Sequence, residues 1–327
     1  MRIQKRNWLS AALLGILAWV CGAAALAQDA AAPAPTAAPT SAAAAAATFP
    51  SCEAAAGAFI AAVKANDSAE LKRILGDKAS DLLSSGDPAR DEQSRLNFIK
   101  NYDTAHAFTY ETKDKATLTV GTKAWPLPFP IVRIDGVWSF DAEAGAQELA
   151  YRRIGHNELD AIKVVQALVA AQKAYAATGH DGQPAGVYAQ RFRSKAGTQD
   201  GLYWDVKDDE TPSPAGDLVA DAATDGATEG STLPNGKPTP FHGYYYRILR
   251  TQGEHAPGGA KDYVTDGRMT GGFAILAWPA EFGRSGVMTF MASKRGKLYQ
   301  SDLGQDTETV IKGLRSFDPG SNWTLVP

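Results

Sequence analysis

Residues 152–179 read "RRIGHNELDAIKVVQALVAAQKAYAATG", which is the longest helical pattern in the chain. Its apolar residues recur at helical spacing and predict one buried stripe: Ala161, Ile162, Val165, Leu168, Val169, Tyr175 and Ala176. Asn157 is placed to cap this helix, with Asp160 in the reciprocal position, and Gly179 is placed to end it. We therefore expect a domain boundary just before the helix, near Gln147.

The sequence before this helix predicts helices first and strands afterwards. Ser51 is a suitable cap for a helix over 52–65, and Ser68 for a second helix that Gly76 ends. A third helix is expected over 89–106, with Leu96, Ile99 and Tyr102 near one face. Strands follow over 107–112, 116–121, 129–134 and 137–141, and Asp135-Gly136 between the last two predicts a type I′ hairpin. Helices followed by an antiparallel sheet indicate an α+β order.

After the long helix, an irregular excursion leads to a second antiparallel sheet. Residues 180–243 are rich in Gly, Pro and Asp, with a short helix expected around Tyr188–Arg193. The expected strands cover 244–250, 272–279, 286–293 and 297–304, with hairpins at Asp266-Gly267 and at 294–296 and a last short helix within 306–317.

This element order loosely resembles two known folds. Residues 49–147, helices against a curved sheet, resemble NTF2-like folds. Residues 148–327, a long helix with an antiparallel sheet, resemble the globular head of type IV pilin-like proteins. The long helix lies in the middle of the chain and has no membrane-embedded segment of its own, which argues against a polymerising pilin.

The first 27 residues have the pattern of a secretory signal peptide. A basic start is followed by an apolar run, and Ala25 and Ala27 form an A-x-A site with cleavage after Ala27. A membrane anchor would need roughly 20 apolar residues, which is longer than this run. Lipidation at Cys21 is disfavoured by the large Trp19 and Val20 before it. We expect a periplasmic or secreted protein with a disordered Ala/Pro linker over 28–48 and no stable transmembrane segment after cleavage.

Charge and cysteine content exclude some functions. Without Arg2, Lys5 and Arg6 the 33 basic residues fall to 30 against 36 acidic ones, a net charge of −6. With no basic cluster to follow a phosphate backbone, we expect no nucleic-acid binding. Cys52 is the one cysteine after the signal, so no internal disulfide forms; we interpret it as a small buried residue rather than a reactive thiol.

Several long motifs resemble the bacterial family known as domain of unknown function 2950. The resemblance covers about Phe49 to Pro327 and rests on "SGDPARDEQSRLNFIKNYDTAH", "WPLPFPIVRIDGVWSFD", "RRIGHNELDAI", "GLYW", "GYYYRILRTQG", "YVTDGRMTGGFAILAWPAEFGRSGVMTF" and "YQSDLG". It implies an exported protein and brings no activity, substrate or catalytic residue with it.

Catalytic and metal-binding patterns are weak. Ser285 in "GRSG" suggests a nucleophile elbow, but Val287 stands where that motif needs glycine and a strand follows instead of a helix, so we interpret Ser285 as a turn residue. The acidic run 205–210 lacks the spacing of a calcium loop, and the histidines are scattered, so we predict no metal, no cofactor and no catalytic residue.

Aromatic residues are the candidate binding residues. Trp125 and Phe129 stand among prolines and suit either the lip of a pocket or a core, and Tyr245 alternates away from its tyrosine neighbours. The predicted binding set is Trp125, Phe129, Tyr203, Trp204, Tyr245 and Trp278. The favoured function is a non-catalytic module that binds an envelope protein, a peptide or a cell-wall component. The alternatives are a periplasmic hydrolase with a pocket between the two halves and an accessory of pilus or secretion machinery.

Overall fold

The computed structural model describes residues 47–76, 88–206, 212–216 and 240–326. The expected signal peptide and nearly all of the expected linker lie outside these residues. The described part of the chain contains helices and sheets that are mostly antiparallel, which confirms the α+β class. Along the described residues, no helix combines the length and the apolar character that a membrane span requires.

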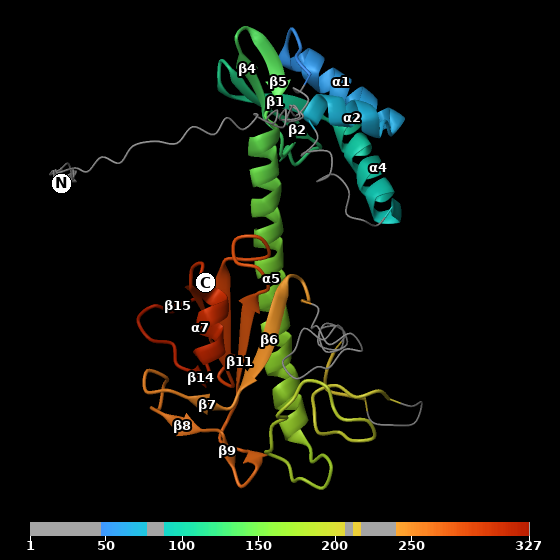
Figure 1. The fold of residues 1–327 in the computed structure, drawn as a ribbon. Helices are drawn as coiled ribbons and strands as arrows, with labels where there is room; N and C mark the ends of the chain where they lie inside the picture. Colours follow the sequence, from blue (N-terminus) through green and yellow to red (C-terminus); the bar gives the residue numbers. More distant parts are fainter. Residues whose placement is uncertain (1–46, 77–87, 207–211, 217–239, 327) are drawn as a thin grey trace, which may run out of the picture. The chain divides into compact units, whose positions relative to one another are not determined.

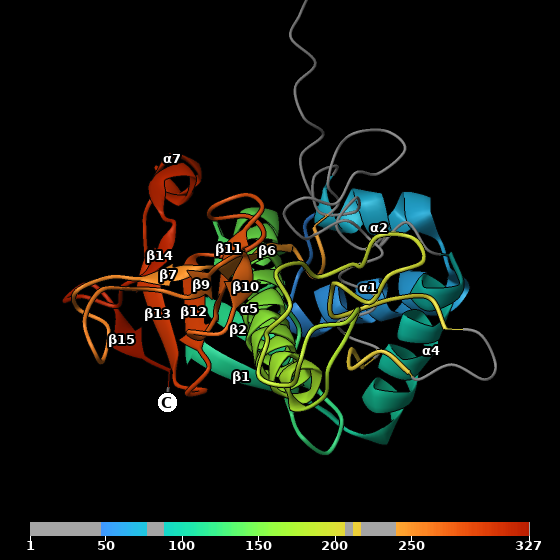
Figure 2. The ribbon, with the colours of Figure 1, turned by 90° about the horizontal axis from the view of Figure 1, so that it is seen from below.

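The first three helices pack together. Helix α1 (Cys52–Ala65) begins after Ser51, as predicted, and the Ser51 hydroxyl accepts a hydrogen bond from the Ala54 N–H at 3.1 Å. Helix α2 (Ser68–Leu75) begins after Asp67, so the predicted cap at Ser68 is wrong by one residue. Helix α4 (Pro88–Thr104) contacts α1, as α2 does (Figure 2).

A five-stranded antiparallel sheet follows the helices. Its order is β1 (His106–Thr112), β2 (Lys115–Val120), β4 (Ile131–Ile134) and β5 (Val137–Phe140), with β3 (Trp125–Pro126) paired to β2. Asp135 (φ 51°) and Gly136 (φ 82°) both have positive φ between β4 and β5, which confirms the predicted type I′ hairpin. One hydrophobic cluster joins α1 and α2 to this sheet.

Helix α5 (Ala142–Ala177) is 36 residues long and starts well before the predicted cap. Asp141 caps it by accepting a bond from the Ala144 N–H at 2.9 Å. Asn157 lies inside the helix instead, and its side-chain amide donates to the Ser285 carbonyl at 2.8 Å. The boundary placed near Gln147 falls within α5, and the division into two subdomains stays a prediction.

The second half of α5 buries the predicted stripe against a second sheet. Ala161, Val165 and Leu168 have no exposed surface. The helix contacts β11 (Ala274–Pro279), which Figure 1 shows beside it, and also β12 (Met288–Ser293). The antiparallel order is β15-β13-β12-β11-β6, where β6 is Tyr244–Leu249, β13 is Leu298–Asp302 and β15 is Thr324–Leu325.

Short elements complete this sheet region. β7 (Thr251–Gln252) pairs with β8 (Lys261–Asp262) and with β14 (Ser316–Phe317), which follows helix α7 (Thr307–Gly313). β9 (Val264–Thr265) and β10 (Arg268–Met269) form the predicted hairpin around Asp266-Gly267.

Two further expectations for local structure are wrong. Residues 188–193 form no helix; Tyr188 bridges Met269 and Arg193 bridges Tyr203, so the segment extends along its neighbours. Leu96 does not join the buried face of α4, because 47% of its surface is exposed, while Phe98, Ile99 and Tyr102 pack on the cluster. The two fold analogies stay predictions.

Candidate functional site

A pocket of about 520 Å³ lies beside α1, α2 and α4. We call it the aromatic pocket. Its apolar lining comes from Phe59, Val63, Leu71, Phe98, Leu127, Phe129 and Leu149. Its polar rim comes from Asn66, Ser68, Asp91, Glu92, Ser94 and Arg95. Its size and its apolar lining with a few polar groups are typical of small-molecule sites.

The phenylalanine rings that line the aromatic pocket are held by packing. Phe59 on α1 meets Phe98 on α4 edge to face, with ring centroids 6.0 Å apart, and Phe140 at 5.4 Å. Phe129 is fully buried and lies directly against Gly145 near the start of α5. Packing between α1, α4 and α5 therefore holds the rings that line the pocket.

Trp125 forms an exposed edge of the aromatic pocket. It follows Ala124, whose φ of 49° is left-handed, and 46% of its surface is exposed. The Arg152 guanidinium from α5 lies 4.8 Å from the centroid of its ring, and Arg152 Nε donates to Glu148 at 2.7 Å. A cation over the ring face holds the tryptophan in place while leaving ring surface open to a ligand.

The polar rim is organised by Arg95. Its guanidinium donates two bonds to Glu92, at 2.9 and 2.7 Å, and a third to the Val63 carbonyl at 3.1 Å. The bond from Arg95 holds the pKa of Glu92 below its usual value. The rings therefore form the apolar wall that can cover a ligand, and the paired Glu92 carboxylate and Arg95 guanidinium border the opening of the aromatic pocket.

The six residues predicted to bind fall in three places. Trp125 and Phe129 both line the aromatic pocket. Tyr245 and Trp278 lie side by side on β6 and β11 with centroids 5.9 Å apart, and the Arg247 guanidinium lies 4.9 Å from the Trp278 ring.

The remaining two predicted residues belong to the loop after α5. The Arg193 guanidinium lies 5.3 Å from the centroid of the Tyr203 ring, and the Tyr203 hydroxyl donates to the Asp205 carboxylate at 3.1 Å. Trp204 is buried, with its ring 5.4 Å from His180. The six predicted residues therefore do not form one aromatic groove. The rings that complete the aromatic pocket are Phe59 and Phe98, which lie on helices α1 and α4.

Ser285 is a turn residue, as predicted. Its hydroxyl accepts a bond from the Glu281 N–H at 2.9 Å and donates to the Glu281 carbonyl at 3.2 Å. Gly286 after it lies against the Tyr244 hydroxyl group, which leaves no room for a side chain. The "SG" pair therefore serves the turn before β12.

The histidines and carboxylates are dispersed. Asp160 lies 3.2 Å from His156 and 3.5 Å from His242, and His255 pairs with Asp318 at 3.0 Å. No three His, Cys, Asp or Glu side chains in the described ranges are grouped to hold a metal ion. Asp208, Asp209 and Glu210 of the acidic run lie outside the described residues; Asp205 pairs with Arg193 at 3.0 Å.

Comparison with known proteins places the chain in a family. No curated protein and no solved structure matches it. The model of the family described as "Protein of unknown function (DUF2950)" matches residues 46–326. That range covers most of the chain, including every described element from α1 to β15. The chain therefore belongs to the DUF2950 family.

Proposed function

We propose that this protein is an exported binding module that holds a small, largely apolar molecule in the aromatic pocket. The observation that carries the proposal is the lining itself: three phenylalanine rings and a half-exposed tryptophan border a volume of about 520 Å³. Pockets of this kind gain affinity by removing ligand surface from water, and a few rim groups fix the ligand's orientation.

Export is supported by the sequence pattern of residues 1–27. A signal peptide cleaved after Ala27 would release the chain into the periplasm or beyond. The ligand is then a molecule of the envelope or its surroundings. A pocket of this volume fits a small molecule rather than a protein surface, and a peptide is the alternative occupant that the test below separates.

The expected affinity is modest. At about 0.3 kcal/mol per non-hydrogen atom, a ligand of about 20 such atoms gains about 6 kcal/mol, which corresponds to a Kd of tens of micromolar. The rim carries Glu92 already paired with Arg95, so net charge on the ligand contributes little there.

The test is a titration of the chain from Gln28 onwards with Nile red, an uncharged apolar dye whose fluorescence rises on burial. Ser94→Trp fills the rim and is expected to lower dye binding at least about 10-fold, and Trp125→Ala is expected to weaken it, whereas Trp125→Phe keeps a ring and restores it. Leu96→Trp is the matched control, since Leu96 is exposed on the same helix and does not line the pocket.

The outcomes separate the occupants. Binding lost in Ser94→Trp and kept in Leu96→Trp supports the proposal. Equal binding by all variants places the dye elsewhere and contradicts it. Competition for the dye by apolar peptides but by no small apolar molecule assigns the pocket to a peptide instead.

A further inference from the structure

Four arginines line a second pocket, which we call the arginine pocket. Its volume is about 470 Å³, and its basic residues are Arg191, Arg247, Arg250 and Arg315. Gln190, Phe192, Ile248, Leu249 and Thr251 also line it, and none of the described residues that line this pocket is acidic. Its lining shares no residue with the aromatic pocket.

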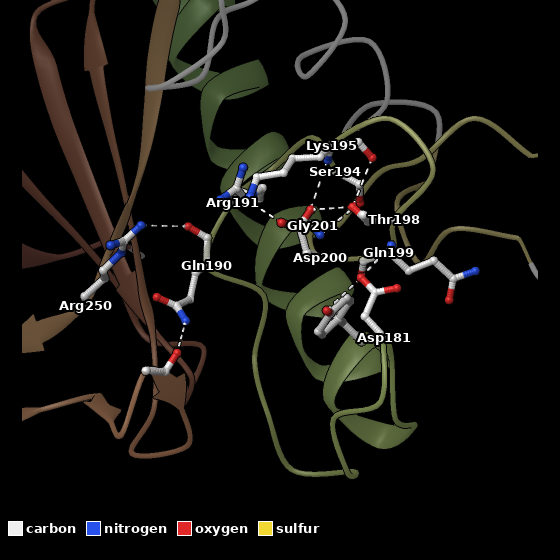
Figure 3. Close-up of polar contacts among 12 residues, drawn as sticks. Asp181, Gln190, Arg191, Ser194, Lys195, Thr198, Gln199, Asp200, Gly201 and Arg250 are labelled. Atoms are coloured by element: carbon white, nitrogen blue, oxygen red, sulfur yellow. Dashed lines mark hydrogen bonds and ion pairs between the residues drawn. The ribbon is translucent and has the colours of Figure 1, made fainter.

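The loop that carries Arg191 is fixed to the sheet on one side. Arg250, which follows β6, donates to the Gln190 carbonyl at 3.2 Å, and the Gln190 side chain donates to the Gly267 carbonyl at 2.7 Å (Figure 3). These bonds cross more than fifty residues of sequence. They hold the segment that carries Arg191 beside Arg250 at the same pocket, and the Arg250 guanidinium bonds a neutral carbonyl there.

The rest of the loop is held by the carboxylates of Asp181 and Asp200, which accept hydrogen bonds from its backbone. Asp181 accepts from the Gln199 N–H at 2.7 Å, and Asp200 accepts from the Lys195 N–H at 3.0 Å (Figure 3). Asp200 also pairs with Arg191 at 3.2 Å. Burial acts to raise the pKa of Asp200, but the Lys195 N–H, the Thr198 hydroxyl and the nearby positive charges lower it, so Asp200 stays ionised beside Arg191.

Arg247 forms the inner wall. Only 7% of its surface is exposed, and its Nη1 donates to the Ile311 and Leu314 carbonyls at 2.9 and 3.1 Å. These two carbonyl groups at the end of α7 orient the guanidinium at the pocket. Ile248 and Leu249 beside it are buried, so this wall is poorly solvated and electrostatic attraction there is stronger than in water.

Arg315 also lines the arginine pocket. It precedes β14, and its carbonyl accepts from the Thr251 hydroxyl at 3.3 Å, while that hydroxyl also bonds Ser316 at 2.7 Å. The parallel pairing of Ser316 with Thr251 fixes the register. Arg191, Arg250 and Arg315 are exposed and therefore accessible to a ligand from solvent.

We propose that the arginine pocket binds a small molecule that carries two or more oxyanion groups, either phosphates or carboxylates. Guanidinium groups present paired N–H donors that match the oxygens of both groups. The volume far exceeds the roughly 30 Å³ that one water occupies in the liquid, so it admits a molecule larger than a single oxyanion. Four arginines from three segments favour an anion with several charged groups over one.

The test is isothermal titration calorimetry of the chain from Gln28 onwards at fixed ionic strength. The probes are pyrophosphate and citrate, with inorganic phosphate and acetate as their single-group counterparts. At least one of the two larger anions is expected to bind about 10-fold or more tightly than its counterpart, and which one does so distinguishes the phosphate from the carboxylate source. Equal affinity within both pairs, or no binding, overturns the proposal.

Variants locate the anion. Arg250→Gln and Arg315→Gln are each expected to weaken binding about 10-fold, as the loss of a charged hydrogen bond implies. Arg284→Gln removes an arginine whose side chain is 79% exposed and lies outside the pocket, so affinity should hold. Equal losses in all three variants, or none, overturn the proposal. Melting temperatures confirm folding, and if Arg250→Gln fails to fold, Arg315→Gln gives the result alone.

Discussion

Gly145 on α5 lies directly against the ring of Phe129, so that a methyl group at position 145 would overlap the ring. Phe129 is fully buried and lines the aromatic pocket, where Phe59 and Phe98 also lie. We expect Gly145→Ala to lower the free energy of unfolding by about 1–3 kcal/mol, because overpacking forces the ring or the helix to shift.

Gly155 provides the matched control on the same helix. Nothing lies within 4 Å of a Cβ built at this position. Gly155→Ala is therefore expected to raise the free energy of unfolding by about 0.5–1 kcal/mol through helix propensity alone. Urea unfolding of the two variants measures both changes, and stabilisation by Gly145→Ala as well as by Gly155→Ala would contradict the close contact at Phe129.

Glu158 joins α5 to the start of β12. Its Oε1 accepts bonds from the Val287 and Met288 N–H groups, both at 2.9 Å. Glu158→Ala leaves two backbone donors without this acceptor, and we expect a loss of about 1–3 kcal/mol in urea unfolding. Glu158→Gln keeps an oxygen acceptor and should lose clearly less. Equal losses in the two variants would show that the charge, not the acceptor, is what matters.

His255 and Asp318 form a pH-dependent pair. The hydrogen bond and the charge of Asp318 raise the pKa of His255 above its usual 6.5. Burial acts to raise the pKa of Asp318, but the bonds from His255 lower it below 3.8. A raised histidine pKa stabilises the folded protein fully below about pH 6.5, and this contribution is lost as pH rises through the raised value.

At the acid end, the contribution of Asp318 is lost as pH falls below 3.8 through its lowered pKa.

The raised pKa of His255 gives the prediction between these limits. We expect the melting temperature of His255→Gln to fall below that of the unchanged protein at pH 5.5, with a smaller difference at pH 8.5. A difference that stays constant between these pH values would rule out the titration of this pair.

Ser285 offers a direct test of the hydrolase alternative. Because its hydroxyl bonds the backbone of Glu281, a fluorophosphonate probe is expected to leave the protein unlabelled, as judged by mass spectrometry. Ser285→Ala should cost about 0.5–1.5 kcal/mol through the lost turn bonds. Labelling that disappears in Ser285→Ala would instead make Ser285 a nucleophile.

Local chemistry made much of the fold predictable. The cap at Ser51 and the hairpins at Asp135-Gly136 and Asp266-Gly267 lie where the sequence places them, because capping oxygens and positive φ act within a few residues. The apolar stripe of α5 was predicted for the same reason: its period reports one buried face.

The start of α5 was not predictable from these signals. Asn157 resembles a cap, and Gly145 and Gly155 weaken the helical pattern before it. The helix nevertheless begins after Asp141, since Gly145 packs on Phe129 and Leu149 on the first hydrophobic cluster. Tertiary packing overrides local propensity there.

Both pockets depend on contacts between distant segments. Trp125 and Phe129 were candidates for a pocket lip, but Phe59 and Phe98 gave no sequence signal other than that of ordinary core residues. The four arginines of the second pocket stand in three segments, and only the pairing of β7 with β14 and the bonds of the 190–201 loop bring them together. The spacing of residues along the sequence does not predict such contacts between distant segments.

Cys52 can report the unfolding of the hydrophobic cluster that joins α1 and α2 to the first sheet. It is 1% exposed, and burial raises the pKa of its thiol, so an alkylating reagent reaches it only when α1 opens. In a chain that starts at Gln28 it is the one cysteine, so alkylation follows the cluster of α1 and the first sheet. Tryptophan emission follows both clusters, because Trp138 belongs to the first and Trp204 and Trp278 to the cluster of α5 and the second sheet. Alkylation that sets in at lower urea than the main change in emission would show that the two clusters unfold in sequence.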